Sequence, residues 1–202
     1  MLINKGFKPK RRQSDTDRDR LPPGQYLTDD FPVLSLGPTP EVSKDKWKLR
    51  VWGLCEETSL SWENLMKLPA SNITKDIHCV TKWSKYDTNW KGVWLDEIIR
   101  LANVDDTASF LIAHSADGYT TNIPIDDVTD KKALIAYEYD GEDIEAGHGG
   151  PVRLVVPHLY FWKSAKWLDG LEFVAEDQPG FWEERGYHNY GDPWLEQRYD
   201  TD

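Results

Sequence analysis

The sequence predicts an α+β fold built from mixed, mainly antiparallel sheets with a few short helices. Many short segments have the alternation or apolar content of strands, and few segments have helical spacing. The strands and helices do not alternate regularly, as they would in a parallel βαβ fold. At 202 residues the chain has the length of one domain.

The strands are predicted from local patterns. Trp47, Leu49 and Val51 alternate with Lys48 and Arg50, which predicts a half-buried strand over residues 46–53. A strand that runs into a loop is expected over residues 74–83. Further strands are expected over residues 108–114, 118–124, 133–139, 151–157 and 167–175, with a tight hairpin turn at residues 140–141, where the sequence is Asp-Gly.

Three helical segments are predicted. Residues 94–102 carry apolar side chains at helical spacing. Residues 60–68 predict a short amphipathic helix, with Ser61 as its N-cap and Leu65, Met66 and Leu68 turned inward. Residues 125–130 predict a helical turn.

The ends of the chain differ from its middle. Residues 1–24 predict a polar N-terminal arm that ends in Leu-Pro-Pro-Gly, so the domain is expected over residues 25–202. Residues 29–41 contain three prolines and should be extended, and the aromatic tail from Gln178 should wrap the surface. Arg11-Arg12 precede charged residues where an export signal needs an apolar run, so we expect a cytoplasmic protein.

Charge and cysteine content exclude several functions. The net charge of −11 argues against binding to nucleic acid or to anionic lipid. The chain has two cysteines and contains no CxxC, CxxCH or HExxH motif. These patterns exclude zinc fingers, c-type haem attachment and zincins. Without an apolar run of 18 residues, we expect no membrane-spanning segment.

Cys79 is the first candidate for chemistry. It lies where a predicted strand passes into a loop that contains Lys82 and Lys85. Nearby cations would favour a thiolate, which could act as a nucleophile or as a soft metal ligand. A lone cysteine can also be a buried apolar residue. The sequence chemistry leaves these alternatives open.

A second candidate region combines glycines with basic residues. Gly147-His148-Gly149-Gly150 would allow a close backbone approach to a ligand. Arg153 follows inside an apolar run, where a guanidinium must be paired. With Lys163, Ser164 and Lys166, these residues predict a phosphate-type anion site. The alternative is a set of surface charges and one Arg–carboxylate pair.

Together these regions resemble the sulfite-oxidase superfamily, and most closely its branch with the bacterial molybdenum sulfoxide reductases. The matching motifs occur in order between residues 31 and 188: His78–Ser84, Ala136–Glu138, His148–Pro157 and Lys163–Leu168. The resemblance implies the fold of that superfamily. It also implies a mononuclear molybdenum–molybdopterin cofactor without an attached nucleotide.

The resemblance implies roles for individual residues. Cys79 corresponds to the protein ligand of molybdenum, and Tyr187 to the active-site tyrosine of the sulfite oxidases. The cofactor-binding positions correspond to Ser115, His148, Arg153, Lys163, Ser164 and Lys166. The physics agrees, because a buried phosphate needs several fixed cations.

One departure concerns the substrate. Sulfite oxidases carry an arginine before the first core strand, whereas residues 31–38 of this chain contain none. We therefore expect oxygen-atom transfer, or related two-electron chemistry, on a small S-oxide or N-oxide. Electrons should be exchanged with a separate protein or carrier, since the chain lacks haem and iron–sulfur motifs. The alternatives are a sulfite dehydrogenase, a non-catalytic binding module and a cysteine hydrolase.

Overall fold

The computed structural model describes residues 19–35 and 37–202. Most of the predicted polar arm therefore lies outside the described residues, as do Arg11-Arg12 and Leu36. Arg20 already contacts the domain, because its guanidinium binds Asp76 and Asp87 at 2.5 and 2.7 Å. Within the described residues, no helix has the length and apolar character needed to cross a membrane.

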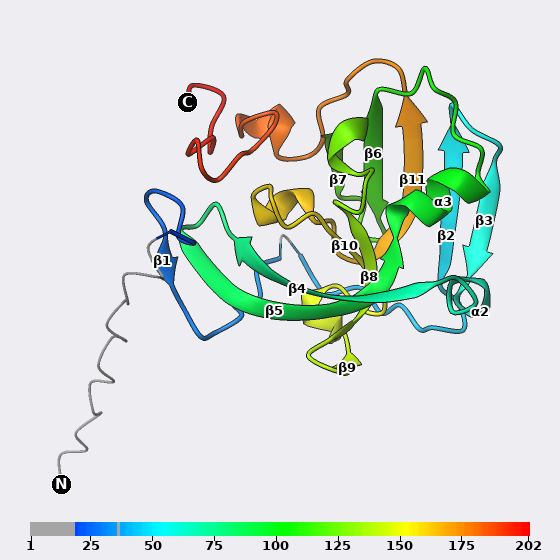
Figure 1. Ribbon diagram of the computed structural model, residues 1–202, viewed down its shortest axis with the longest axis horizontal. Coiled ribbons are helices and arrows are strands. Elements are labelled where there is room, and N and C mark those ends of the chain that lie inside the picture. The colour runs from blue at the N-terminus through cyan, green and yellow to red at the C-terminus, as the bar shows by residue number, and fades with distance from the viewer. Residues whose placement is uncertain (1–18, 36) are drawn as a thin grey trace, which may run out of the picture.

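One sheet has five strands, visible on the right of Figure 1. Strands β2 and β11 pair in parallel, and the other pairs of this sheet are antiparallel. The strand order is β3 (Thr58–Ser61), β2 (Lys48–Gly53), β11 (Leu168–Val174), β6 (Phe110–Ser115) and β7 (Thr120–Pro124).

The second sheet is organised around one long, curved strand, β5 (Trp83–Trp94), which sweeps across the lower part of Figure 1. Its short parallel partner at one end is β1 (Tyr26–Leu27). The antiparallel members are β4 (Ala70–His78), β8 (Leu134–Tyr139), β9 (Glu142–Asp143) and β10 (Arg153–Val155). The prediction of mixed, mainly antiparallel sheets is confirmed.

The main core contains side chains from both sheets and from helix α3 (Leu95–Leu101). Leu49 and Val51 are buried on β2 while Lys48 and Arg50 are exposed, so the predicted alternation is confirmed. Leu95 and Ile98 bury one face of α3 against the same core. Asp140 and Gly141 both adopt positive φ angles between β8 and β9, which confirms the predicted tight turn.

The short helix α2 (Trp62–Leu65) is capped as predicted. The Ser61 hydroxyl accepts a hydrogen bond from the Asn64 N–H at 3.3 Å. Leu65 is fully buried, but Met66 is 38% exposed, so its predicted inward orientation is wrong. The helix makes a single turn and ends at Leu65, which leaves Met66 at its C-cap facing solvent.

Strand β5 is the main element that the sequence analysis missed. The buried residues Ser84, near its start, and Thr88, in its middle, are polar and hide the apolar pattern of a buried strand, but both have hydrogen-bond partners nearby. The Thr88 hydroxyl donates to Lys75 O at 2.5 Å, and Ser84 Oγ lies 2.8 Å from His78 Nδ1. A bulge at Lys91–Gly92 further breaks the alternation.

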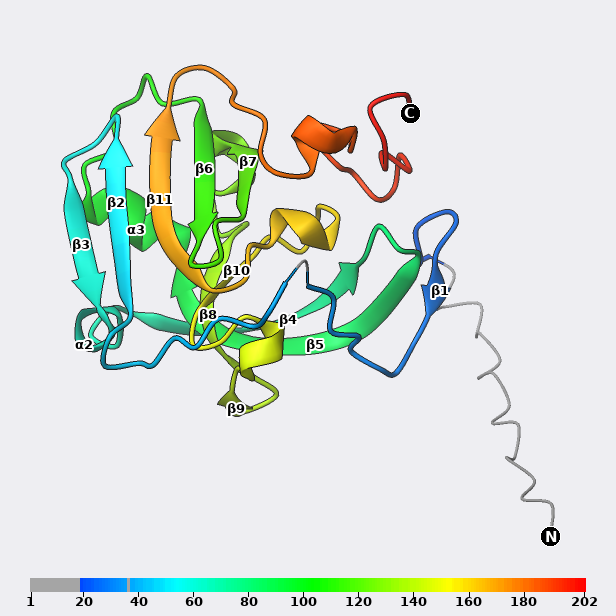
Figure 2. The same ribbon diagram turned by 180° about the vertical axis from the view of Figure 1, so that it is seen from behind.

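The site lies between three segments with little regular structure. Residues 28–35 run from β1 past the 3₁₀ turn η2 (Ala146–His148), as Figure 2 shows from behind. A loop follows β10 and contains η3 (Phe161–Lys163). The C-terminal tail contains η4 (Glu183–Arg185) and lies across from the end of β5 that pairs with β1. The turn predicted over 125–130 is present as η1 (Ile125–Asp127).

Candidate functional site

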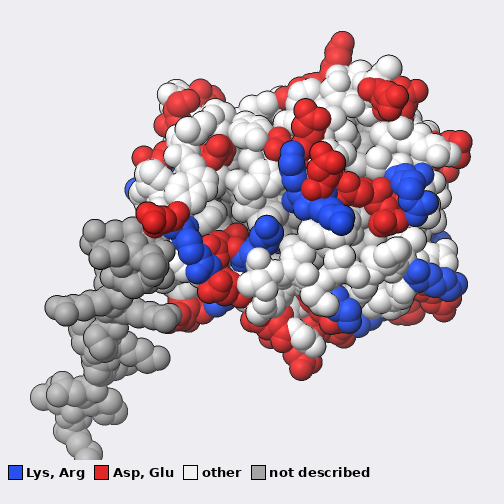
Figure 3. All heavy atoms as spheres, viewed as in Figure 1, with Lys and Arg blue, Asp and Glu red and all other residues white. Residues whose placement is uncertain are grey.

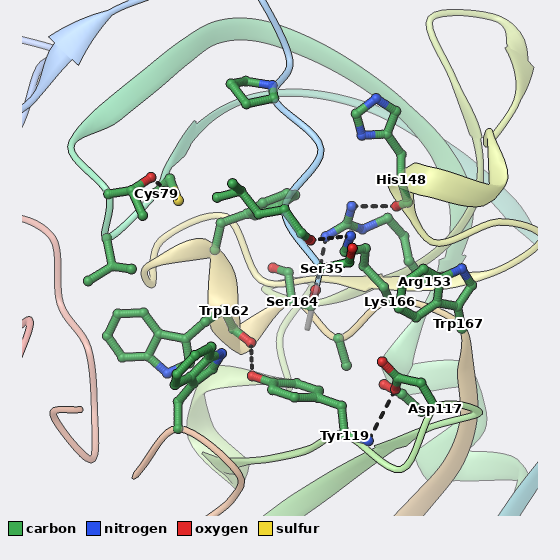
Figure 4. A pocket seen from close by; sticks show the side chains of 18 of the residues that line it. Ser35, Cys79, Asp117, Tyr119, His148, Arg153, Trp162, Ser164, Lys166 and Trp167 are labelled. Carbon is green, nitrogen blue, oxygen red and sulfur yellow. Dashed lines mark hydrogen bonds between the residues drawn. The ribbon is translucent and has the colours of Figure 1, made fainter. Parts of the chain in front are cut away.

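A cavity of about 370 Å³ lies between the β4–β5 hairpin, residues 31–35, the η3 loop and the tail. Most of its wall is aromatic or apolar, and includes Phe31, Trp83, Phe161, Trp162 and Trp182. All but one of the predicted site residues line it: Ser115, Cys79, His148, Arg153, Ser164, Lys166 and Tyr187. In Figure 4, Cys79 lies on one side of this cavity, and His148, Arg153 and Lys166 lie on the other.

Cys79 is the first residue of the tight turn that joins β4 to β5. Its N–H donates to Trp83 O at 2.8 Å, and its carbonyl accepts from the Lys82 N–H at 3.0 Å. Lys82 has a φ of 78°, which this turn requires. Gln25 Nε2 also donates to the Cys79 carbonyl, at 3.0 Å. The hairpin therefore holds Cys79 rigidly at the edge of the cavity.

Cys79 is 7% exposed, and its thiol lies 3.1 Å from the Thr81 hydroxyl. Burial raises its pKa, while Thr81 and the positive charge of Arg198 act in the opposite direction. The cations expected to act on the thiol were Lys82 and Lys85. Neither lines the cavity, and Lys85 Nζ donates to Asp29 O at 2.5 Å.

Arg198 is the cation that sequence reasoning missed. It comes from the far C-terminus, and its Nη1 donates to Val80 O at 2.8 Å. Its side chain is nearly buried against the Tyr160 ring. No local signal could have identified it, because 118 residues separate it from Val80.

Arg153 is the strongest sign of an anion site. It is only 2% exposed, and its guanidinium donates to His148 O at 2.6 Å and Ser164 O at 2.9 Å. It also lies 4.2 Å from the centre of the Phe161 ring. Burial alone lowers its pKa to about 9, without a carboxylate to oppose the effect. The alternative of an Arg–carboxylate pair therefore does not match the described structure.

Lys166 adds positive potential beside Arg153, and the imidazole of His148 also lines this end of the cavity. Lys166 Nζ donates to Leu34 O at 2.6 Å and Gly147 O at 2.9 Å. Its pKa falls to about 8 because of burial and then because of Arg153. Burial and Arg153 also lower the pKa of His148, whose ring stacks on Phe31 at 4.0 Å. These bases are held together by main-chain carbonyls, which supply no compensating charge.

One acid, Asp117, also lines the cavity. Its Oδ1 accepts the Tyr119 N–H at 3.1 Å, as Figure 4 shows. Burial and Arg153 lower the pKa of Lys166, and Asp117, the smallest of the three influences, raises it. The negative charge of Asp117 therefore does not cancel the positive charges of Arg153 and Lys166 at this end of the cavity.

Two polar atoms in the cavity wall have no hydrogen-bond partner among the residues that the structure describes. Ser115 Oγ and Trp83 Nε1 are both buried without a hydrogen bond, and both residues line the cavity. An unsatisfied buried polar group is costly, so such groups indicate a missing ligand or water. The Ser164 hydroxyl differs, because it accepts the Val156 N–H at 2.9 Å.

Lys163 is placed differently from the expectation. Its side chain does not line the cavity and is fully buried beside Glu183 at 2.6 Å. Its Nζ also donates to Asn122 and to Asn189 O. The ammonium is therefore fully engaged elsewhere and offers no charge to a ligand in the cavity. Spacing could not reveal this, because the partners of Lys163 and Lys166 lie in different parts of the fold.

Tyr187 reaches the cavity from the tail. Its N–H donates to Trp182 O at 3.1 Å. Its ring packs against Trp162 and Trp182, at centroid distances of 5.3 and 4.7 Å. Burial raises the pKa of the phenol, so it stays protonated and can donate a hydrogen bond. Phe31, Thr81, Trp83 and Tyr119 are further lining residues that the sequence analysis did not identify.

The cysteine-hydrolase alternative needs a base beside Cys79. All five histidines lie in the described part of the chain, and only His148 lines the cavity, where it stacks on Phe31. His78 contacts Ser84 instead, and burial lowers its pKa to about 4. The geometry therefore does not support a Cys–His pair.

Comparisons with known proteins agree with this geometry. The model of the family described as "Oxidoreductase molybdopterin binding domain" matches residues 36–182. A curated relative, the "Uncharacterized oxidoreductase YuiH" of Bacillus subtilis, is 47% identical over 96% of this chain and 98% of its own length.

More distant relatives have related names. The "Putative protein-methionine-sulfoxide reductase subunit YedZ1" of Azospira oryzae is 31% identical over 75% of this chain and 58% of its own length. The mitochondrial sulfite oxidase of Rattus norvegicus is 25% identical, over 84% of this chain and 38% of its own length. The sulfane dehydrogenase SoxCD of Paracoccus pantotrophus has a similar fold, with a TM-score of 0.63 at 23% identity, over 68% of this chain and 40% of that one.

Proposed function

The chain belongs to the sulfite-oxidase superfamily of oxidoreductases with a molybdopterin-binding domain, and we propose that it transfers an oxygen atom to or from a small S-oxide or N-oxide. We further propose that Cys79 is the protein ligand of the metal. The observation that carries the proposal is one cavity with a buried cysteine on one side and uncompensated buried cations on the other.

The residues present fit a molybdenum–molybdopterin cofactor. Arg153 and Lys166 are buried or half-buried cations that bond to no carboxylate among the described residues, which leaves their charge available to a terminal phosphate. Trp83 Nε1 and Ser115 Oγ are unpaired groups in the wall, available to the polar edges of a pterin. When bound, the cofactor supplies the two-electron redox chemistry, and the protein supplies orientation and electrostatics.

Each residue then has a distinct task. His148, Arg153 and Lys166 hold the phosphate, while Ser115 and Ser164 contact the adjoining polar atoms. The thiolate of Cys79 is held in place by its hairpin. The Tyr187 phenol donates a hydrogen bond to the substrate oxygen, and the surrounding aromatic side chains restrict access of water to the reacting atoms.

A neutral or weakly charged substrate suits the remaining surface. Phe31, Pro32, Leu34 and Ser35 line the cavity, and none is charged. The available cations are those assigned to the phosphate. Sulfite oxidation is the second candidate function, favoured by the similarity to the rat enzyme.

We propose that electrons are exchanged one at a time with a separate protein or a small carrier. Two cysteines are too few to hold an iron–sulfur cluster. The name of the Azospira relative describes a subunit, which also supports a partner.

Metal and pterin analysis of the purified protein tests the proposal. After expression with ample molybdate, we expect close to one molybdenum and one pterin per chain, with no nucleotide released on hydrolysis. Protein that is folded but free of both would favour the alternative of a non-catalytic binding module.

A further inference from the structure

We propose that Lys163 is a positioning residue that fixes the tail segment carrying Tyr187 against the cavity. The inference rests on the proposed function only for the catalytic task of Tyr187. The "tail segment" here means residues 182–189, which include the turn η4.

The ammonium of Lys163 contacts the tail segment on both sides of Tyr187. Nζ lies 2.6 Å from Glu183 Oε1 and donates to Asn189 O at 2.7 Å. It also donates to the carbonyl and the side-chain oxygen of Asn122 on β7, at 2.8 and 2.9 Å. The buried ammonium of Lys163 therefore connects strand β7 to Glu183 and Asn189, which lie on either side of Tyr187 in the sequence.

The carboxylate of Glu183 extends this connection to the cavity wall. Its Oε1 accepts the Trp162 indole N–H at 2.9 Å and the Thr121 hydroxyl at 3.2 Å. The Trp162 ring lines the cavity and meets the Tyr187 ring at an interplanar angle of 81°. The contacts that hold Lys163 thus also orient the aromatic ring against which Tyr187 rests.

If Lys163 served only to stabilise the folded protein, it would not need to form a buried ion pair with Glu183. The side chains of Lys163 and Glu183 are 0% and 2% exposed, and a buried ion pair is seldom more stabilising than apolar packing. Its directional contacts instead specify one arrangement of neighbouring segments. The Phe181 N–H donates to Thr120 O at 2.9 Å and Gly191 O accepts from the Tyr160 N–H at 2.8 Å, which fixes the chain on either side of the tail segment, and Lys163 contacts the residues between these two points.

The test compares two lysines that are three residues apart. In Lys163→Met we expect faster amide exchange across residues 181–191, unchanged exchange in β4 and β5, and unchanged molybdenum and pterin content. In Lys166→Met, the matched control, we expect loss of cofactor with the tail still protected. Loss of cofactor from Lys163→Met, or a tail as protected as in wild type, would overturn the proposal.

A double-mutant cycle separates positioning from general destabilisation. If Lys163 acts through Tyr187, adding Lys163→Met to Tyr187→Phe should lower turnover no further than Tyr187→Phe alone. An additive loss would overturn the positioning role. The pair Lys163→Met/Glu183→Gln leaves no buried charge unpaired and provides a folded variant if the single change is unstable.

The catalytic task proposed for Tyr187 can be wrong while the positioning role of Lys163 is right. If Tyr187→Phe keeps full turnover while Lys163→Met loosens the tail, the positioning proposal stands. The catalytic task given to Tyr187 is then wrong.

Discussion

Cys79 and Arg153 are both buried in the same cavity, but they have different electrostatic surroundings. The thiol is held by a hairpin whose main-chain contacts do not depend on its sulfur. The guanidinium of Arg153 carries a charge that no carboxylate pairs with in the described part of the chain. Substitutions at these two positions should therefore have different consequences for cofactor content and for turnover.

Cys79→Ser should leave a folded protein that retains its pterin but loses turnover. The hairpin bonds survive, whereas the soft thiolate ligand is replaced by a hard hydroxyl.

Arg153→Ala should instead yield mainly cofactor-free protein, since removing one member of a buried charge pair costs about 3–5 kcal/mol. Pterin content and single-turnover kinetics on both variants check this. Wild-type turnover of Cys79→Ser would show that the ligand assignment is wrong.

Lys166 predicts a pH dependence. In the cofactor-free protein its pKa is lowered to about 8, mainly by burial. Between that value and its ordinary pKa of 10.5, the unfolded chain binds more protons than the folded one, so cofactor-free protein gains stability as pH rises. A phosphate restores the charged form, so its binding takes up a proton and weakens as pH rises above about 8.

The measurement is the difference in Tm between loaded and cofactor-free protein. We expect this difference to be greatest below about pH 8 and to shrink toward about pH 10. Lys166→Arg, whose guanidinium stays charged, should flatten the dependence on pH. An equal difference across the range in wild type would contradict the assignment of Lys166 to the phosphate.

Residues 31–35, which precede β2, close one side of the cavity. Phe31 stacks on His148 and contacts Trp83, Trp90 and Phe161 at centroid distances of 6.1 to 6.2 Å. Lys166 holds the same segment through the carbonyl of Leu34. The segment therefore lies against both the anion end and the aromatic wall.

Phe31→Ala should open this side of the cavity. Because Phe31 is half-buried, we expect a loss of about 1–2 kcal/mol of unfolding free energy. In cofactor-free protein, Cys79 should be alkylated by iodoacetamide faster than in wild type. Val33→Ala is the matched control, since Val33 lies in the same segment but is 52% exposed. Equal alkylation rates in the two variants would mean that residues 31–35 do not restrict access.

Local patterns identified most elements but not the longest strand or the position of each functional side chain. The alternation on β2 and the spacing on α3 depend on one amphipathic face and are visible in the sequence. In β5 that signal is hidden, because Thr88 is buried with a partner supplied by β4. Lys163 and Arg198 depend on contacts with residues far along the chain, which no local pattern contains.

The whole molecule carries a net charge of −11, and Figure 3 shows acidic side chains spread over one of its faces. Such a surface does not attract small anions toward the cavity. Inside the cavity, the basic side chains are those assigned to the phosphate: His148, Arg153 and Lys166. A dianionic substrate would have to share them.

Sulfite should therefore be a poor substrate, and a neutral S-oxide or N-oxide a better one. Sulfite loses several kcal/mol of hydration when it is buried, and only fixed cations can offset that loss. Residues 31–35 offer none, Lys82 and Lys85 do not line the cavity, and Arg198 is bound to Val80 O. Tyr187 remains as a neutral donor that suits a polarised S=O or N–O oxygen. Steady-state kinetics with artificial electron carriers should give a lower kcat/KM for sulfite than for the best oxide in a panel. If sulfite exceeds every oxide, Arg198→Met, Lys82→Ala and Lys85→Ala will show which cation holds it.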